Sequence, residues 1–338
     1  MSLMRAETGE AADAVRRCLG QRAAFAALAA RLQALDPALV VVSARGSSGH
    51  AGTFLRYVLA RDAGVVAAAA MPSIASLYRR RQRLSGALFV AISQSGRSPD
   101  LVLSAEQARA AGALTLALVN DPASPLAAAC ETVLPLAAGE ERSVAATKTV
   151  LASLAAGLAL VAAWRGDAAL GAALDRLPAR LQAAMSLDWS ALGAMLARTD
   201  RMFTIGRGPG LAIAAEAALK LAEVAGIAGL AYSAAELPHG PRTLAGPDFP
   251  VLGLVQDDEG HAGTAALLAD LAARGVTVLA AGAQGPGIVT LPGLPADHPD
   301  TDLLCQLASF YRAVEAAARA RGRDPDHPPG LHKVTRTV

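Results

Sequence analysis

The sequence is poor in cysteine and carries almost no net charge, and each shortage excludes a class of protein. Its three cysteines, Cys18, Cys130 and Cys305, are far apart and form no CxxC pair. This spacing argues against a disulfide framework and a zinc site, and it fits a reducing cytoplasm. The formal net charge of +2 is too small to indicate a nucleic acid or a membrane surface as a partner. We therefore expect a cytoplasmic protein that binds neither.

The chain also lacks a hydrophobic run of the kind that spans a membrane. The longest apolar stretch, about Val150–Trp164, is short and rich in alanine and glycine, so it predicts a buried helix. No signal peptide is visible at the N-terminus. Apolar residues make up 53% of the 338 residues but aromatics only 4%, which favours two domains with many closely packed helices.

Lysine is unusually scarce among the basic residues. Of 31 such residues, 28 are arginine and three are lysine, namely Lys148, Lys220 and Lys333. Arginine keeps its proton in proteins, whereas lysine can become a neutral, nucleophilic amine. Three lysines could remain by accident, but their rarity makes them candidates for a chemical role.

Short apolar runs alternate with helical segments after an N-terminal stretch, about Thr8–Leu35, whose periodicity predicts one or two helices. Helices are predicted at Gly49–Ala63 and Pro99–Ala111, and a long helix at Val144–Trp164 closes the first half. This alternation indicates a doubly wound α/β sheet that binds ligands at the carboxyl ends of its strands. The predicted buried strands are Ala38–Ser43, Val65–Ala70, Ala87–Ile92, Leu114–Val119 and Thr132–Leu136.

The second half repeats this pattern. "VSARGSS" (Val42–Ser48) and "TIGRGPG" (Thr204–Gly210) both read as strand, Arg-Gly, then helix, which indicates a tandem duplication. We predict an α/β fold with two tandem doubly wound, flavodoxin-like parallel-sheet domains and helices on both faces. The predicted boundaries are 1–35 for N-terminal helices, 36–166 and 167–323 for the domains, and 324–338 for a tail. The second-half elements are helices near Ala168–Arg198, Leu211–Ala225 and Leu303–Arg321, and strands at Val251–Val255, Val276–Ala280 and Gly287–Leu291.

The stretch "SQSGRSPD" (Ser93–Asp100) follows a predicted buried strand and begins a helix. Ser98 suits the N-cap, Pro99 the first helical position and Asp100 the first turn. Such a corner directs backbone N–H groups, hydroxyls and the positive end of a helix dipole to one small volume, which can hold a phosphate. A capped strand-to-helix turn without a ligand has the same sequence pattern.

A second glycine- and serine-rich corner, "RGSSGHAG" (Arg45–Gly52), follows the first predicted strand, and we expect it to face the other corner across the sheet's switch point. The corresponding stretch of the second half ends in Asp257, Asp258 and Glu259, whose carboxylates would repel a phosphate. We therefore predict one anion site per chain, in the first half. A dinucleotide site is disfavoured because "GRGPGLA" lacks the G-x-G-x-x-G spacing. No metal-ligand spacing is present, so no metal or other cofactor is expected.

Three further stretches carry titratable groups. "EAALKLAEVAG" places Glu216, Lys220 and Glu223 on one helix face, a pattern that is typical of a solvated charge stripe. "SAAELPHGPRTL" holds His239 in a proline-flanked bend, where a lone histidine is usually an exposed surface residue without a functional role. The C-terminal "DHPPGLHKVTRTV" carries Lys333 and is typical of a frayed cationic tail.

Together these stretches resemble the tandem sugar-isomerase (SIS) domain family over nearly the whole chain, from about Val41 to the C-terminus. "SQSGRSPD", "VAATK", "ALKLAE", "AELPHGP" and "GLHKVT" match the family's motifs in order and at about the family's spacing. The resemblance is closest to the isomerase half of glucosamine–fructose-6-phosphate aminotransferase and to the SIS-type glucosamine-6-phosphate deaminases. The chain departs from the family pattern at Ala222, Ala146 and His332, which bears on sugar specificity more than on reaction class.

The resemblance implies roles for individual residues. Glu223 resembles the base that moves a proton between C1 and C2 of the sugar, and Lys220 lies beside it in the sequence. His239 resembles the residue that opens the sugar ring, supplied by the neighbouring subunit of a homodimer. Lys333 resembles the terminal lysine that contacts, or forms an imine with, the open-chain sugar. The implied substrate-binding residues are Gly46, Ser47, Ser48, Ser93, Gln94, Ser95 and Ser98 at the 6-phosphate, and Val144 and Ala146 along the sugar.

The activity that this resemblance implies is deamination of glucosamine 6-phosphate to fructose 6-phosphate and ammonia by proton shuttling between C1 and C2. Three alternatives stay open: an aminotransferase-like isomerase without a glutaminase domain, another aldose–ketose isomerase of phosphosugars, and a sugar-phosphate sensor. A glutaminase domain needs an N-terminal nucleophilic cysteine, and here the first cysteine is Cys18, inside a helical pattern. A helix-turn-helix regulator is disfavoured because the N-terminal segment 1–35 is too short for such a domain.

Overall fold

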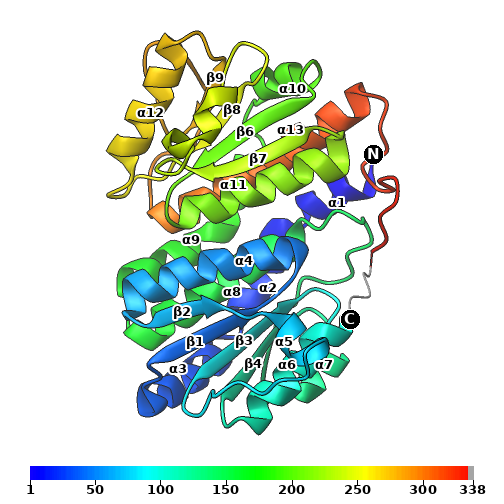
Figure 1. Cartoon of the computed structure of the whole chain (residues 1–338), viewed down its shortest axis with the longest axis vertical. Coiled ribbons are helices and arrows are strands. Elements are labelled where there is room, and N and C mark those ends of the chain that lie inside the picture. Colours follow the sequence, from blue (N-terminus) through cyan, green and yellow to red (C-terminus); the bar gives the residue numbers. More distant parts are fainter. Residues whose placement is uncertain (334–338) are drawn as a thin grey trace. The chain divides into compact units, whose positions relative to one another are not determined.

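The computed structural model describes residues 1–333 and contains two parallel five-stranded sheets (Figure 1). The chain divides into two compact units, one around each sheet. The first-sheet unit consists of residues 13–141, 148–175 and 332–333, and the second-sheet unit of residues 1–12, 142–147 and 176–331. The predicted α/β fold with two parallel sheets is confirmed.

The first sheet has the strand order β2-β1-β3-β4-β5, and all neighbouring strands are parallel. The central strands β3 and β4 are buried along their whole length, because helices cover both faces of the sheet. The prediction of a buried strand near Val65–Ala70 was wrong in its burial: this strand lies at the sheet edge, and Val66 is 68% exposed. The strands are β1 (Leu39–Ser43), β2 (Val66–Ala69), β3 (Leu88–Ser93), β4 (Leu114–Val119) and β5 (Thr132–Pro135).

Helices cover both faces of the first sheet, as predicted. Phe89 and Ala91 point toward α6 and α7 in one hydrophobic cluster. Gly52 of α4 approaches Val42 on the opposite face, where a Cβ on the glycine would lie 3.1 Å from the valine side chain. The helices in the first half of the chain are α2 (Ala11–Leu19), α3 (Arg22–Leu35), α4 (Gly46–Val58), the π-helical turn η1 (Leu59–Ala63), α5 (Pro72–Ser76), α6 (Pro99–Ala110), α7 (Pro125–Ala129), α8 (Lys148–Arg165) and α9 (Ala168–Ala184).

Helix α8 begins four residues later than the predicted Val144. Residues 142–147 are not helical, because the buried Glu7 carboxylate accepts hydrogen bonds from the backbone N–H groups of Arg142 (2.5 Å) and Ser143 (3.1 Å) and holds them in an extended loop. By length and composition α8 would suit a membrane span. However, 83% of its apolar window is buried inside the protein, which is the environment of a core helix.

The second sheet has the order β10-β9-β8-β6-β7 and is also parallel. Counted from its own first strand, this order is 2-1-3-4-5, the same as in the first sheet and as in flavodoxin-like folds. The sequence prediction missed β7, whose alanines and glycine have low strand propensity. Its glycine is required by packing, since a Cβ on Gly229 would lie 2.7 Å from the carbonyl oxygen of Ala218. The strands are β6 (Arg201–Gly206), β7 (Ala228–Ser233), β8 (Val251–Leu254), β9 (Val278–Ala281) and β10 (Ile288–Thr290).

The second sheet also has helices on both faces. Helix α12 packs through Leu268 against Val251 and Val278, and α11 lies on the other face, where the Thr204 hydroxyl donates to the Ala214 carbonyl. The stretch Thr8–Leu35, predicted to form one or two helices, contains α2 and α3, and a separate short helix precedes them. The remaining elements are α1 (Leu3–Gly9), α10 (Ser190–Leu196), α11 (Pro209–Lys220), the π-helical turn η2 (Leu221–Ala225), the 3₁₀ turns η3 (Leu237–His239) and η4 (Pro241–Leu244), α12 (His261–Ala273) and α13 (Pro299–Ala320).

Candidate active site

The first candidate element is the corner between β3 and α6. Ser98 has the extended backbone of an N-cap and Pro99 opens the helix, as predicted, but the Ser98 hydroxyl makes no capping hydrogen bond. The hydroxyl of Ser93 accepts from the Gly96 N–H (3.0 Å) and that of Ser95 from the Arg97 N–H (3.3 Å). Gly96 has φ +63°, and a Cβ there would lie 2.1 Å from the Ser124 hydroxyl. This tight turn therefore requires glycine.

The second corner connects β1 to α4 at the same edge of the first sheet, because β1 and β3 are adjacent and parallel. Gly46 has φ +52°, and a Cβ at this position would meet nothing within 4 Å, so its surroundings are open. Ser47 and Ser48 lie in the first turn of α4 and are partly exposed. The strand order reverses at this point, where doubly wound sheets bind their ligands. The structure thus brings together the two corners that the sequence singled out.

The arginines of these corners are already paired. Arg45 donates through Nε (2.9 Å) and Nη2 (2.6 Å) to one oxygen of Asp100, which is fully buried and connects the two corners. Arg97 pairs with Asp121 at 2.9 Å. The corners therefore offer mainly hydroxyls and backbone N–H groups at helix N-termini, which suit a phosphate.

One polar side chain at this edge was missed by the sequence analysis. Ser43 is the last residue of β1, and its hydroxyl is buried without a hydrogen-bond partner among residues 1–333. Burying an unsatisfied hydroxyl is unfavourable. The only signal in the sequence was a polar residue at the end of a hydrophobic strand, next to the glycine-rich corner.

The equivalent corner of the second sheet, between the ends of β6 and β8, is filled by its own side chains. The Gln256 amide donates to the Arg207 carbonyl (2.8 Å) and to Asp258 Oδ2 (2.9 Å), and Asp258 Oδ1 accepts from the Gly260 N–H (2.8 Å). A Cβ on Gly210 would lie 2.4 Å from the Gln256 oxygen. A carboxylate and an amide thus occupy the corner that in the first sheet presents serines.

Glu216, Lys220 and Glu223 form a buried network, so the pattern is not a solvated charge stripe. Lys220 Nζ lies 3.3 Å from Glu216 Oε1 and 2.7 Å from Glu223 Oε2. The Glu216 and Lys220 side chains are 1% exposed, whereas Glu223 is 21% exposed. Tyr311, from α13, donates its hydroxyl to Glu216 Oε1 at 3.0 Å. Among these four side chains, Glu223 is the most exposed to solvent.

The helix changes geometry within this network. Helix α11 ends at Lys220, and η2 continues as a π-helical turn that contains Glu223 and closes on Gly226 with φ +64°. Such π-turns are frequent at functional sites. Burial by itself would lower the pKa of Lys220, but the Glu216 and Glu223 carboxylates outweigh it and raise that pKa above its usual value. Lys220 is thus a fixed cation that orients Glu223, not a neutral nucleophile.

The "VAATK" motif begins in the loop of residues 142–147, which belongs to the second-sheet unit. Val144 and Ala146 are partly exposed there and Thr147 is buried. Lys148 starts α8 and is itself buried. Two of the three lysines in this chain, Lys148 and Lys220, are therefore fully buried, where a compact ammonium fits and a guanidinium needs more room.

Lys333 is held in place rather than frayed. Its Nζ lies 3.4 Å from Oε2 of Glu141, a fully buried carboxylate that also accepts from the Thr149 N–H (3.2 Å) and hydroxyl (2.5 Å). This contact was not predicted from the sequence. Residues 334 and 335 of the "GLHKVT" motif lie outside the described part of the chain.

His239 makes no described contact with the other candidate residues. It ends the 3₁₀ turn η3 and is exposed, with its N–H donating to the Glu236 carbonyl at 3.0 Å. The next residue, Gly240, has φ +134°, a conformation that few residues other than glycine adopt. Within residues 1–333, no hydrogen bond or ion pair connects the imidazole to another candidate residue.

The three cysteines are unsuited to nucleophilic or metal chemistry. Burial raises the pKa of Cys18, Cys130 and Cys305 to about 12, so none forms a thiolate near neutral pH. Among the described residues, no group of three or more His, Cys, Asp and Glu side chains is arranged to hold a metal ion.

Comparison with known proteins places this architecture in a family. The SIS domain family model matches residues 37–163 and 195–282. The isomerizing glutamine–fructose-6-phosphate aminotransferase of Symbiobacterium thermophilum is 35% identical over 329 residues, which cover 90% of this chain and 52% of that protein. The chain thus spans about half the length of the curated relatives that it matches.

Solved structures match the whole fold. One from Silicibacter pomeroyi DSS-3, provisionally described as a phosphosugar isomerase, is 42% identical with a TM-score of 0.93 and covers 96% of this chain and 100% of that one. The glucosamine-6-phosphate deaminase of Thermotoga maritima has a TM-score of 0.82 at 18% identity, covering 99% of this chain and 100% of that one, which shows a shared fold alone. With its two sheets, its serine corners and the match to the family model, the chain belongs to the SIS domain family.

Proposed function

We propose that this protein is a phosphosugar isomerase that converts glucosamine 6-phosphate to fructose 6-phosphate and ammonia. The observation that carries the proposal is the partly exposed Glu223 carboxylate, which the buried cation of Lys220 holds at 2.7 Å. Hydrogen transfer between C1 and C2 of a sugar needs one positioned base that takes a proton and returns it. A carboxylate that is fixed by a protonated lysine meets this need.

The phosphate would bind at the two serine corners of the first sheet. The residues proposed to hold it are Gly46, Ser47, Ser48, Ser93, Gln94, Ser95 and Ser98, with the N–H groups that begin α4 and α6. Because Arg45 and Arg97 are engaged by aspartates, neutral donors would carry most of the binding. Val144 and Ala146 would line the sugar.

The proposed reaction starts from the open-chain aldose. Glu223 takes the proton from C2, the electrons of the C2–H bond form a C1–C2 double bond, and the aldehyde oxygen at C1 takes up a proton to give an enaminol. Glu223 then returns its proton to C1 while the amino nitrogen gives up one proton. The C2 imine that results reacts with water to give the ketose and ammonia. Lys333, positioned by Glu141, would contact the open-chain carbonyl or form an imine with it.

The buried cysteines support deamination over glutamine-dependent synthesis by these residues. Releasing ammonia from glutamine at a cysteine requires a thiolate, and burial holds the pKa of all three thiols near 12. A cytoplasmic setting, where such sugars are metabolised, fits this proposal.

We also infer that His239 acts in the site of a second copy of the chain. It is exposed on a turn that Pro238 and Gly240 restrain, and its imidazole suits acid–base help with ring opening near neutral pH. Mixing inactive Glu223→Ala protein with inactive His239→Ala protein should restore up to about a quarter of the activity by random pairing. No recovery despite demonstrated subunit exchange would mean that each site uses one chain.

The decisive experiment is a coupled assay for ammonia released from glucosamine 6-phosphate. Release by the native protein and its loss in Glu223→Gln supports deamination. Interconversion of glucose 6-phosphate and fructose 6-phosphate without ammonia release would make the protein a plain aldose–ketose isomerase. Tight binding of these sugars without any turnover would identify a sugar-phosphate sensor instead.

A further inference from the structure

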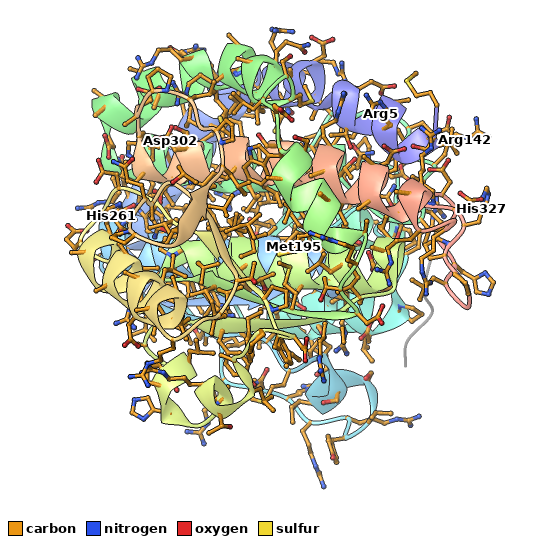
Figure 2. All side chains as sticks on the ribbon, turned by 90° about the horizontal axis from the view of Figure 1, so that it is seen from above. Arg5, Arg142, Met195, His261, Asp302 and His327 are labelled. Carbon is orange, nitrogen blue, oxygen red and sulfur yellow. The ribbon has the colours of Figure 1, made fainter. Side chains whose placement is uncertain are left out.

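The second-sheet unit contains a cavity that none of the candidate catalytic residues lines. It has a volume of about 360 Å³ and lies at the carboxyl ends of β8 and β9, bounded by Val255–Asp257, Ala281–Gly282 and Pro292–Leu294. Figure 2 labels two more lining residues, His261 at the start of α12 and Asp302 in the first turn of α13. Doubly wound sheets bind ligands at this edge, and the volume suits a small molecule.

The cavity wall presents one buried acceptor without a donor among the described residues and one exposed carboxylate. Gln306 lines it and donates its amide N–H to the Val255 carbonyl at 2.7 Å, which turns its carbonyl oxygen the other way. That oxygen is buried and has no donor among the described residues. The Asp257 carboxylate, which also lines the cavity, is exposed. A ligand that donates hydrogen bonds would satisfy both groups.

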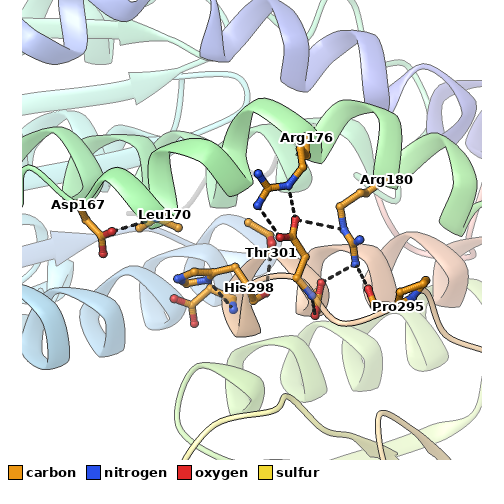
Figure 3. A network of polar contacts seen from close by, with 10 residues as sticks. Asp167, Leu170, Arg176, Arg180, Pro295, His298 and Thr301 are labelled. Atoms are coloured by element: carbon orange, nitrogen blue, oxygen red, sulfur yellow. Dashed lines mark hydrogen bonds and ion pairs between the residues drawn. The ribbon is translucent and has the colours of Figure 1, made fainter.

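The cation in the wall is not available to an anion. Arg180 reaches from α9 and donates to Asp302 (2.7 Å) and to the Pro295 carbonyl (2.7 Å), and Asp297 is shared with Arg176 (Figure 3). Two carboxylates thus neutralise the two guanidinium groups. Burial raises the pKa of Asp302 despite this pairing.

Two further features point to a sugar ring. Trp189 forms part of the wall, and its indole N–H donates to the Pro292 carbonyl at 2.9 Å, which fixes the ring. An immobile aromatic side chain next to carboxylate and amide oxygens is the usual chemistry for binding a polyol. Asp258 and Glu259 follow Asp257 directly, and their charge disfavours a phosphate.

We propose that this cavity is a second ligand site that takes a phosphate-free hydroxylated or amino-bearing sugar, a free hexosamine being the matching probe. The proposal rests on the lining residues and does not depend on the deaminase activity. It assigns opposite preferences to the two sheets: phosphorylated sugars at the first and unphosphorylated ones at the second.

The test is titration of the whole protein with glucosamine, followed by ligand-observed NMR, with saturating fructose 6-phosphate present to occupy the serine corners. We expect saturable binding that fructose 6-phosphate does not displace and that persists in Ser95→Asp. Gln306→Leu and Asp257→Asn should each weaken it by about ten-fold, as loss of one hydrogen bond to a charged or buried group does. Asp248→Asn, an exposed aspartate outside the cavity, is the matched control and should bind like the native protein.

Three outcomes would overturn the proposal. Displacement of glucosamine by fructose 6-phosphate would place it at the serine corners, and absence of saturation in folded protein would leave the cavity without this ligand. Equal affinity for glucosamine in Asp257→Asn and in the control would show that glucosamine binds outside the cavity. Thermal unfolding shows whether Gln306→Leu folds. If it does not fold, Asp257→Asn still tests the cavity, because Asp257 is exposed and its substitution should leave the fold intact.

Discussion

The carboxyl edges of the two sheets share the same backbone conformation at one corner. In each, the first strand leads through an arginine into a glycine with φ +52°, Gly46 or Gly208, and then into a helix. In the first sheet, the neighbouring strand leads into Ser93 and Ser95, whose hydroxyls accept hydrogen bonds from backbone N–H groups of the same turn. In the second, it ends in Gln256 and Asp258, which hydrogen-bond across the corner. The same backbone therefore carries serines in one half and a hydrogen-bonded amide and carboxylate in the other, depending on a few side chains after one strand.

The helices that follow these corners, α4 and α11, also differ between the two halves, but here the buried polar groups are in the second half. Both end in a π-helical turn that closes on a left-handed glycine, Gly64 or Gly226. The first turn carries an exposed Arg61–Asp62 pair, and the second belongs to the buried network around Lys220. In the proposed function, the first sheet contributes the phosphate-binding corner and the second sheet contributes the base.

The largest expected effect comes from removing the base. Glu223→Gln keeps the size of the side chain but removes the proton acceptor, so we expect kcat to fall by about 1,000-fold with little change in KM. Asp62→Asn, in the equivalent π-turn of the first half, should keep activity within about two-fold of the native protein, since exposed substitutions have small effects. Steady-state kinetics of both variants test this, and comparable losses would remove the functional difference between the two turns.

Removing the buried cation should affect stability. Lys220→Met removes the cation that pairs with the buried Glu216 carboxylate, and we expect a loss of about 3–5 kcal/mol in unfolding free energy. Urea unfolding measures it. Arg61→Met, in the equivalent turn of the first half, should cost under about 1 kcal/mol because its ion pair is part-exposed. An equal loss in both variants would show that the second network contributes no special stability.

Placing a negative charge in the serine corner should abolish phosphosugar binding. Ser95→Asp is expected to weaken fructose 6-phosphate binding by at least about 100-fold, or 2.7 kcal/mol, while the fold stays intact because the Ser95 side chain is partly exposed. Calorimetry gives the affinity. Glu259→Ser at the second edge should change it less than about two-fold, and unchanged affinity in Ser95→Asp would move the phosphate site elsewhere.

A change that preserves charge tests Lys333. Lys333→Arg should fold normally and keep its ion pair with Glu141, yet lose about 100-fold in ammonia release, because a guanidinium cannot form an imine. Near-native turnover in this variant would leave Lys333 a purely electrostatic role. Borohydride trapping of substrate on the native protein, absent in the variant, would identify the imine directly.

The smallest effect concerns pH. A lysine whose pKa is raised in the folded state adds stability that is complete below the unfolded pKa and is lost as pH rises through the folded pKa. The pKa of Lys220 is raised above 10.5, so unfolding free energy should decline above that pH in the native protein. Lys220→Met should show a flatter alkaline profile. Parallel profiles would contradict the coupling.

Much of the fold was predictable because its signals are local. Apolar runs followed by glycine and serine marked β1 and β3 with their corners, and Pro99 marked the start of α6. The match between the two halves followed from "ARG" and "GRG" after a strand. Strand β7 was not predicted because its alanines and glycine have low strand propensity. They form a strand because they pair with β6 and pack closely on α11.

The amino-acid sequence by itself determined the alternation of strands and helices, the serine corners and the rarity of lysine. Only the tertiary structure decided which charges are buried. Tyr311 reaches Glu216 across 95 residues, and Lys333 reaches Glu141 across 192. The spacing of Glu216, Lys220 and Glu223 is the same whether that helix face meets solvent or α13. Burial depends on contacts between segments that are distant in the sequence, so no local pattern encodes it. These contacts set the charge state of Lys220 and the environment of Glu223.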